Sequence, residues 1–169
     1  MNYAQFDIAR KWLLRGFFVC ASAPDKKDGG IKQDATEFNI GIHLGTNIED
    51  NGPPAYVHVL DFDDADLYHA WKARNPDLAI TPTQQTPGGG YHVLFTLPYT
   101  ARNAKHAKLD VIGYGWYILV EPSTVNGKPY KWIVPDYLKS THFDSLEKTG
   151  IFDLIPEDEF EWEPDNYDD

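Results

Sequence analysis

The sequence has little cysteine, no long apolar run and no excess of basic residues. Its single cysteine, Cys20, excludes a disulfide within the chain and a zinc site built from cysteines, so we expect a reducing, cytoplasmic setting and no structural zinc. No apolar run approaches the roughly eighteen residues of a membrane span. The N-terminus also lacks a basic start followed by an apolar signal core, and we expect no association with a membrane.

The shortage of basic residues, 15 against 26 acidic ones, is confined to one end of the chain. Residues 140–169 hold 11 acidic residues and one basic residue, whereas residues 1–139 are almost neutral. The body of the protein is therefore not barred from binding phosphates. A chain of 169 residues with 42% hydrophobic composition suffices for one folded domain. We predict that domain over residues 1–139, followed by an acidic segment over 140–169 that is partly helical and then extended or disordered.

Hydrophobic periodicity predicts a mixed α+β fold. Helical spacing occurs over residues 3–16 and between Asp64 and Pro76. Segments typical of strands lie at residues 17–21, 39–45, 56–62, 91–97, 108–112, 116–120 and 129–134. Because strands dominate without regular alternation with helices, we expect a single domain with one curved, largely antiparallel mixed sheet flanked by helices.

Asp61 and Asp63 are the first residues that suggest a chemistry. They stand two apart at the end of a predicted strand, so their side chains project to one face, beyond Val57 and Val59. Two neighbouring carboxylates repel each other unless a cation intervenes, and such oxygen ligands suit Mg²⁺ or Mn²⁺ together with substrate phosphates. Two alternatives are a solvated turn that caps the next helix and the metal site of a sugar transferase.

A glycine run at residues 86–92 (TPGGGYH) opens directly into the next predicted strand. Gly89 and Gly90 permit close approach of a ligand and offer backbone amides to phosphate oxygens. His92 can donate to a phosphate without adding a fixed charge. The alternative is a hairpin turn followed by a histidine whose hydrogen bonds are satisfied within the fold.

Asp110 is a single carboxylate in the apolar stretch 109–113 (LDVIG). An acid in such a run needs a partner. If a neighbouring strand brings it to Asp61 and Asp63, the three complete the carboxylate cluster of a site that uses two divalent ions, Mg²⁺ or Mn²⁺, for phosphoryl or nucleotidyl transfer.

Taken in order, these motifs resemble the primase-polymerase (prim-pol) domain of the archaeo-eukaryotic primase superfamily, as found in plasmid and viral replication proteins. The resemblance consists of short blocks rather than continuous identity. The blocks are residues 15–19 (RGFFV), 39–45 (NIGIHLG), 59–63 (VLDFD), 86–92 (TPGGGYH), 109–111 (LDV), 120–123 (VEPS) and 130–132 (YKW).

The resemblance implies a catalytic core related to the RNA-recognition-motif fold over residues 1–139. It also implies a template-directed nucleotidyltransferase that adds nucleotides from nucleoside triphosphates to a DNA or RNA primer on a DNA template. Asp61, Asp63 and Asp110 match the family's metal ligands, and His92 matches its histidine that contacts the incoming triphosphate. Further candidates for contact with the triphosphate are Gly89, Gly90 and Ser123.

Two positions depart from the family pattern. Relatives often carry a basic residue beside the histidine and another just after the third aspartate, whereas this sequence has Tyr91 and Ile112 there. Candidate replacements are Lys26, Lys27, Lys32, Lys105 and Lys108. The sequence also lacks the extra helical domain with which many relatives begin a primer, so either this protein extends primers or another chain supplies that step.

A catalytically weakened or inactive relative, acting as a DNA- or partner-binding module, is therefore the alternative function. The acidic end, residues 156–169 (PEDEFEWEPDNYDD), has the composition of a peptide for a basic groove. It could dock a helicase or single-strand-binding protein, shield a DNA groove, or remain merely solvated. Several aromatic residues could stack on bases, although strand alternation should bury most of them. They are Trp71, Tyr114, Trp116, Tyr130 and Trp132.

Overall fold

The structure is a computed structural model and describes residues 4–30 and 37–164. The helices are α1 (Ala4–Leu14) and α2 (Ala65–Arg74), with 3-10 helices η1 (Leu146–Thr149), η2 (Ile151–Asp153) and η3 (Glu157–Glu159). The longer strands are β1 (Val19–Ser22), β2 (Asn39–His43), β3 (Tyr56–Phe62), β4 (Thr83–Gln85), β5 (Tyr91–Leu97), β7 (Leu109–Ile112), β8 (Tyr117–Val120) and β11 (Lys131–Val134). The two-residue strands are β6 (Ala104–Lys105), β9 (Thr124–Val125), β10 (Lys128–Pro129), β12 (Thr141–His142) and β13 (Glu161–Trp162).

The strands confirm the α+β prediction. The large sheet has the order β11-β4-β5-β3-β7-β6-β13, with β12 beside β5, and its pairs are antiparallel except β12 with β5. A smaller sheet has the order β1-β2-β8. Thus β2 and β3, although consecutive in the chain, belong to different sheets.

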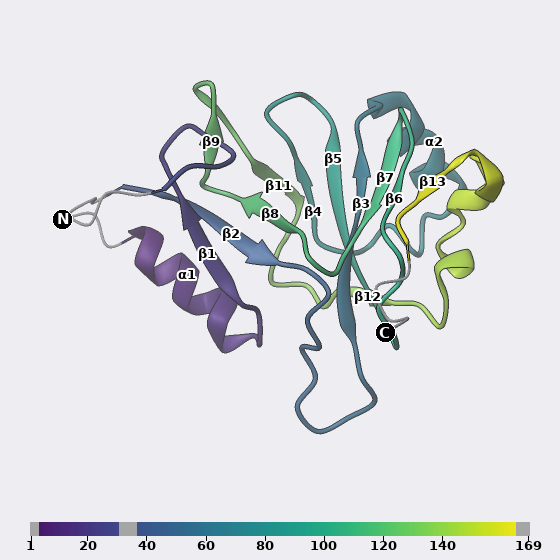
Figure 1. The fold of residues 1–169 in the computed structure, drawn as a ribbon, viewed down its shortest axis with the longest axis horizontal. Coiled ribbons are helices and arrows are strands. Elements are labelled where there is room, and N and C mark those ends of the chain that lie inside the picture. Colours follow the sequence, from purple (N-terminus) through teal and green to yellow (C-terminus); the bar gives the residue numbers. More distant parts are fainter. Residues whose placement is uncertain (1–3, 31–36, 165–169) are drawn as a thin grey trace.

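Each face of the large sheet has its own apolar core. Alternate residues of β3 divide between them: Val57 and Val59 face α1 and the small sheet, whereas Leu60 and Phe62 face α2 and the 3-10 helices. Figure 1 shows α1 beside β1 and β2 at one end of the molecule and α2 at the other. Because β5 is covered on both faces and flanked on both edges, all seven of its residues are buried.

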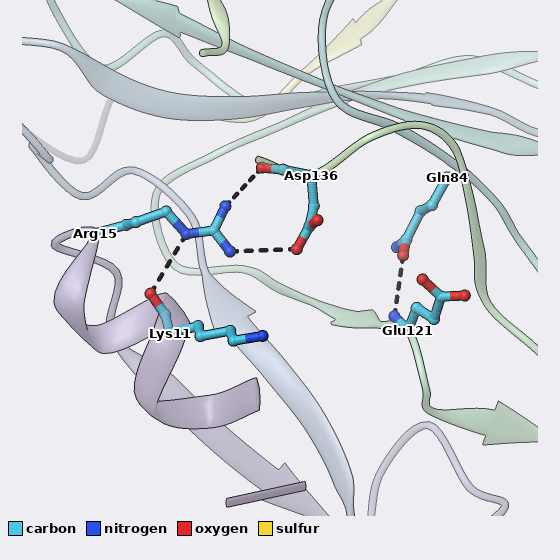
Figure 2. Close-up of polar contacts among 5 residues, drawn as sticks. All are labelled: Lys11, Arg15, Gln84, Glu121 and Asp136. Atoms are coloured by element: carbon cyan, nitrogen blue, oxygen red, sulfur yellow. Dashed lines mark hydrogen bonds and ion pairs between the residues drawn. The ribbon is translucent and has the colours of Figure 1, made fainter. Parts of the chain in front are cut away.

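The two predicted helices form for identifiable reasons. Asp64 caps α2, since its Oδ1 accepts a hydrogen bond of 3.0 Å from the Leu67 amide. Just after α1, the Arg15 guanidinium stacks 4.1 Å from the centre of the Trp12 ring. Arg15 also donates to the Asp136 backbone carbonyl at 2.5 Å and pairs with its carboxylate at 3.2 Å (Figure 2). Arg15, the first residue of the block 15–19, therefore anchors the end of α1 to the segment after β11.

The acidic C-terminal segment belongs to the same core as far as the structure describes it. The strand β12 pairs with β5, and β13 pairs with β6. Phe143, Leu146, Ile151, Ile155 and Phe160 are buried against the large sheet. Phe160 of the predicted docking peptide, residues 156–169, is therefore used internally, whereas the division of the chain at residue 140 and the docking of a partner stay predictions. Residues 165–169 of that peptide lie outside the described residues.

Among the residues described, no helix has both the length and the apolar character needed to cross a membrane.

Candidate active site

Strand register places three of the predicted site residues, together with Gln84, in one row across the large sheet. Gln84 of β4 lies opposite His92 of β5, His92 lies opposite Asp61 of β3, and Asp61 lies opposite Asp110 of β7. Directly opposed residues of antiparallel strands project to the same face. Four polar side chains on adjacent strands therefore point together toward the small sheet.

This row forms part of a cleft of about 890 Å³ between the two sheets. Asp61, Asp63, His92 and Asp110 all line it, together with residues 117–119 of β8. Asp63 stands one residue beyond the end of β3 and is exposed, rather than lying on the strand beside Asp61 as the sequence suggests. The predicted metal ligands and the predicted histidine thus share one concave surface.

Burial and mutual repulsion act on the carboxylates of the cleft. Partial burial raises the pKa of Asp63, and the nearby Asp61 and Asp110 carboxylates raise it further. Burial likewise raises the pKa of Asp110, and Asp61 adds to the effect. The Asp110 Oδ1 accepts a hydrogen bond of 3.1 Å from the His106 amide, which opposes the increase. Unfavourable negative charge therefore accumulates where a cation would relieve it.

The donor set fits a hard divalent cation completed by substrate. Across residues 4–30 and 37–164, no three His, Cys, Asp or Glu side chains gather closely enough to hold a metal ion among themselves. Mg²⁺ commonly takes one or two carboxylates from the protein and its remaining ligands from water and phosphates. Asp61, opposite Asp110 and electrostatically coupled to Asp63, supplies that kind of partial site.

His92 is held between an acid and an amide. Its Nε2 lies 3.4 Å from the Asp61 Oδ1, and its Nδ1 lies 3.1 Å from the Gln84 Nε2. The Gln84 orientation is fixed independently: its Nε2 donates to the Leu119 carbonyl at 2.7 Å, and its Oε1 accepts from the Glu121 amide at 3.3 Å (Figure 2). Since Gln84 presents an N–H to His92, the ring accepts at Nδ1 and carries its proton on Nε2, toward Asp61 and the cleft.

Tyr130 completes the floor beside the histidine. Its ring centre lies 5.9 Å from that of His92, and the residue is 3% exposed. Burial, with a smaller effect of the Asp61 charge, raises the pKa of Tyr130 to about 12. Its hydroxyl therefore remains a neutral donor in the physiological range.

The family model of the bifunctional DNA primase/polymerase N-terminal domain (Prim-Pol) matches residues 9–147. The chain belongs to the Prim-Pol family. This membership establishes a DNA primase/polymerase type of function in general terms, in agreement with the row of site residues. Curated proteins offer no match to the chain.

The glycine run of this Prim-Pol domain is a hairpin turn between β4 and β5, and the Gly89 and Gly90 amides have acceptors within the turn. The Gly89 amide donates to the Thr86 carbonyl at 2.9 Å, and the Gly90 amide donates to the Thr86 Oγ1 at 3.1 Å. Gly89 has a φ of +89°, and a Cβ on Gly90 would stand 2.2 Å from the Phe62 carbonyl oxygen. Turn geometry therefore accounts for both glycines, and their contact with the triphosphate stays a prediction.

Ser123 is also structural. It is 2% exposed, its Oγ accepts from the Ile40 amide at 2.8 Å, and it donates to the Ile40 carbonyl at 3.1 Å. The hydroxyl thus both accepts and donates a hydrogen bond to β2, and these bonds connect the end of β8 to that strand. The predicted contact of Ser123 with the nucleotide is therefore not supported.

The two departures from the family pattern have different consequences. Tyr91 points away from the cleft and stacks on Tyr68, with ring centres 4.1 Å apart. A basic side chain at this position would therefore not face the carboxylates. Ile112 does line the cleft. Cations reach the cleft from elsewhere: Lys27 and Lys105, both predicted candidates, and Lys128, which sequence reasoning missed.

The structure does not place the other predicted lysines in the lining of the cleft. Lys108 lies 3.9 Å from the Asp64 carboxylate, at the start of α2. Lys26 is not among the residues that line the cleft. Lys32 lies outside the described residues. Sequence reasoning did not predict Gln84 either. Antiparallel pairing across the turn at residues 86–90 would have placed it opposite His92.

Proposed function

We propose that this chain is a template-directed nucleotidyltransferase that extends a DNA or RNA primer on a DNA template from nucleoside triphosphates. The observation that carries the proposal is the register that sets His92, Asp61 and Asp110 side by side on three adjacent strands within one cleft. Membership of the Prim-Pol family supports the same reaction class.

Asp61, Asp63 and Asp110 are the residues that would hold two divalent ions, Mg²⁺ or Mn²⁺. Such ions supply charge neutralisation for the triphosphate, activation of the primer 3′-hydroxyl and stabilisation of the leaving pyrophosphate. The oxygen of that hydroxyl forms the new bond to the α-phosphorus, and the bond between the α-phosphorus and the bridging oxygen toward the β-phosphate breaks. The contribution of the protein is to position these groups and to complement their charge.

The remaining side chains of the cleft suit the triphosphate. His92 carries its proton on Nε2, where it can donate to a phosphate oxygen. Lys27, on the loop after β1, and Lys128, at the start of β10, supply positive charge. Their segments are joined, because Asp25 accepts hydrogen bonds from the Asn126 and Gly127 amides. These lysines take the place of the basic residues that the family pattern would put beside the motifs.

Extension of an end-labelled primer on a DNA template tests the proposal, with dNTPs or NTPs and with Mg²⁺ or Mn²⁺. The wild type should lengthen the primer, and the variant that combines Asp61→Asn with Asp63→Asn should not. Asp66→Asn, which removes an exposed carboxylate from the first turn of α2, is the matched control and should retain activity. No extension by the wild type with any of these substrates and metals, or undiminished extension by the double variant, would refute it.

The second candidate is a non-catalytic module that binds DNA or a partner, and Ile112 in place of a cleft cation favours it. Thermal unfolding with Mn²⁺ and a nucleoside triphosphate separates the two. A functional site predicts a higher Tm with both ligands together and the loss of this shift in Asp110→Asn. A non-catalytic module predicts no shift in either protein.

A further inference from the structure

The turn between β7 and β8 keeps aromatic side chains at the surface. Tyr114 is 56% exposed, Trp116 is 39% exposed and Tyr117 is 37% exposed. By contrast, the tryptophans Trp12 and Trp71 are each 1% exposed. We refer to residues 113–117 as the aromatic turn.

The exposure is not the result of a loose loop. A Cβ on Gly45 would stand 2.4 Å from the Tyr114 Cα, so only a glycine lets the two segments pack this closely. The Trp116 amide donates to the Gly113 carbonyl at 3.0 Å, and the Trp116 carbonyl accepts from the Leu44 amide at 2.9 Å. The backbone is therefore fixed while the rings face solvent, which lowers the entropic cost of binding a flat ligand.

A cation accompanies the exposed rings. The Lys105 Nζ lies 5.5 Å from the centre of the Trp116 ring. Lys105 and Trp116 also line the same cleft as Asp110, so the aromatic turn is continuous with the candidate active site. An aromatic face next to a positive charge is the combination with which proteins hold single-stranded nucleic acid, because the base stacks on the ring and the cation attracts the phosphate.

We propose that Trp116, supported by Tyr114 and Lys105, stacks on an unpaired base of single-stranded DNA where the strand approaches the cleft. That this strand is the template rests on the proposed polymerase function, whereas the binding itself needs neither metal nor nucleotide. Duplex DNA hides its base faces and should use the turn poorly. A purely apolar protein partner would gain nothing from Lys105.

Binding of a fluorescently labelled oligothymidylate of about 16 nucleotides tests this, measured by anisotropy without divalent metal. Trp116→Leu should weaken binding about tenfold, because stacking on one aromatic residue is worth that much or more. Trp116→Phe, which keeps an aromatic face, should stay much closer to the wild type. Tyr137→Leu is the matched control, since Tyr137 is 78% exposed and does not line the cleft.

Three results would overturn the proposal: a wild type that does not bind the oligonucleotide, a Trp116→Leu variant with wild-type affinity, and an equal loss of affinity for the matching duplex. If Trp116→Leu is less stable toward heat, the comparison between Trp116→Phe and the wild type, both folded, decides in its place. In that comparison, an affinity of Trp116→Phe about tenfold or more below that of the wild type would count against stacking.

The outcome is separable from that of the proposed function. The variant that combines Asp61→Asn with Asp63→Asn should bind the oligonucleotide at least as tightly as the wild type, because it removes two negative charges from the cleft, while failing to extend a primer. Binding that depends on Trp116 in a protein without polymerase activity would refute the proposed function and uphold the stacking site. Primer extension by the wild type, together with unchanged oligonucleotide binding in Trp116→Leu, would uphold the proposed function and refute the stacking site.

Discussion

The Gln84 Nε2 lies 3.1 Å from the His92 Nδ1, and this contact sets which ring nitrogen faces the cleft. Gln84 is fully buried and joins the two sheets, because it belongs to β4 yet donates to the Leu119 carbonyl of β8. A buried amide with its other bonds satisfied has no freedom to rotate. The orientation of the His92 ring is therefore fixed by Gln84, which need not touch the nucleotide.

Replacing Gln84 should alter both His92 and the contact between β4 and β8, because the Gln84 Nε2 serves both. Gln84→Glu keeps the acceptor for the Glu121 amide but removes the N–H that faces His92, so the imidazole should move its proton to Nδ1. Nitrogen NMR of protein labelled at histidine should show the Nε2–H tautomer in the wild type and a change in Gln84→Glu, with His92→Gln identifying the signals. The KM for the nucleotide should rise more than kcat falls, because Gln84 is a positioning residue. An unchanged tautomer in Gln84→Glu would contradict this role.

Asp110→Asn should separate activity from stability. The repulsion and burial that raise the pKa of Asp110 disfavour its charged form in the fold, and the neutral amide removes that cost while keeping an oxygen for the His106 amide. We expect a Tm in the absence of metal equal to or above that of the wild type. Primer extension should fall at least about 100-fold, the scale on which weakened metal sites lose activity. A clearly lower Tm would show that the carboxylate is structural.

Much of the site could be predicted from sequence because its signals are local. The period-2 pattern of β3 sets Asp61 on the face of Val57 and Val59, and the structure confirms it. Other predictions depended on hydrogen-bond partners that the pattern does not reveal. Ser123 bonds to Ile40 of another strand, 83 residues away in the chain, and the Gly90 amide bonds to the Thr86 side chain within its own turn.

The C-terminal segment illustrates the same limit. Its acidic composition is typical of a solvated tail, but a few apolar residues between the acids determine its packing. Phe160 is 5% exposed, and β13 adds to the edge of the large sheet. Pairing of a two-residue strand with a distant edge depends on tertiary context, which local pattern and composition do not record.

His58 should make the protein sensitive to acid. It is fully buried, its ring contacts the Tyr56 carbonyl through Nδ1 at 2.9 Å, and its Nε2 accepts from the Ala101 amide at 3.0 Å. Burial lowers the pKa of His58 from 6.5 to about 4. Because the folded pKa lies below the unfolded one, the associated stability is complete above pH 6.5 and is lost as the pH falls toward 4.

Between pH 7 and pH 5 this effect should remove about 2 kcal/mol from the free energy of unfolding. Urea denaturation at both pH values measures it. The free energy of unfolding of His58→Gln should be lower than that of the wild type at pH 7 and should fall less between pH 7 and pH 5. His69→Gln, at an exposed position of α2, should show the same fall as the wild type. Asp63 and Asp110 act in the opposite direction, because raised carboxyl pKa values favour the fold at low pH. If the free energy of unfolding of His58→Gln falls between pH 7 and pH 5 as much as that of the wild type, groups other than His58 cause the acid sensitivity.

Lys27 and Lys128 should control nucleotide affinity. Both line the cleft, and the Lys27 charge partly opposes the rise in the pKa of Asp63, which places Lys27 within electrostatic reach of the metal ligands. A charged hydrogen bond to phosphate is worth enough that Lys128→Met should raise the KM for the nucleoside triphosphate about tenfold. Steady-state primer extension at varied nucleotide concentration measures this, with Lys72→Met on the exposed surface of α2 as the control. If these lysines replace the missing basic residues of the family pattern, Ile112→Arg should partly restore the affinity of Lys128→Met. An Ile112→Arg substitution that leaves the KM of Lys128→Met unchanged would show that the two positions do not serve the same phosphates.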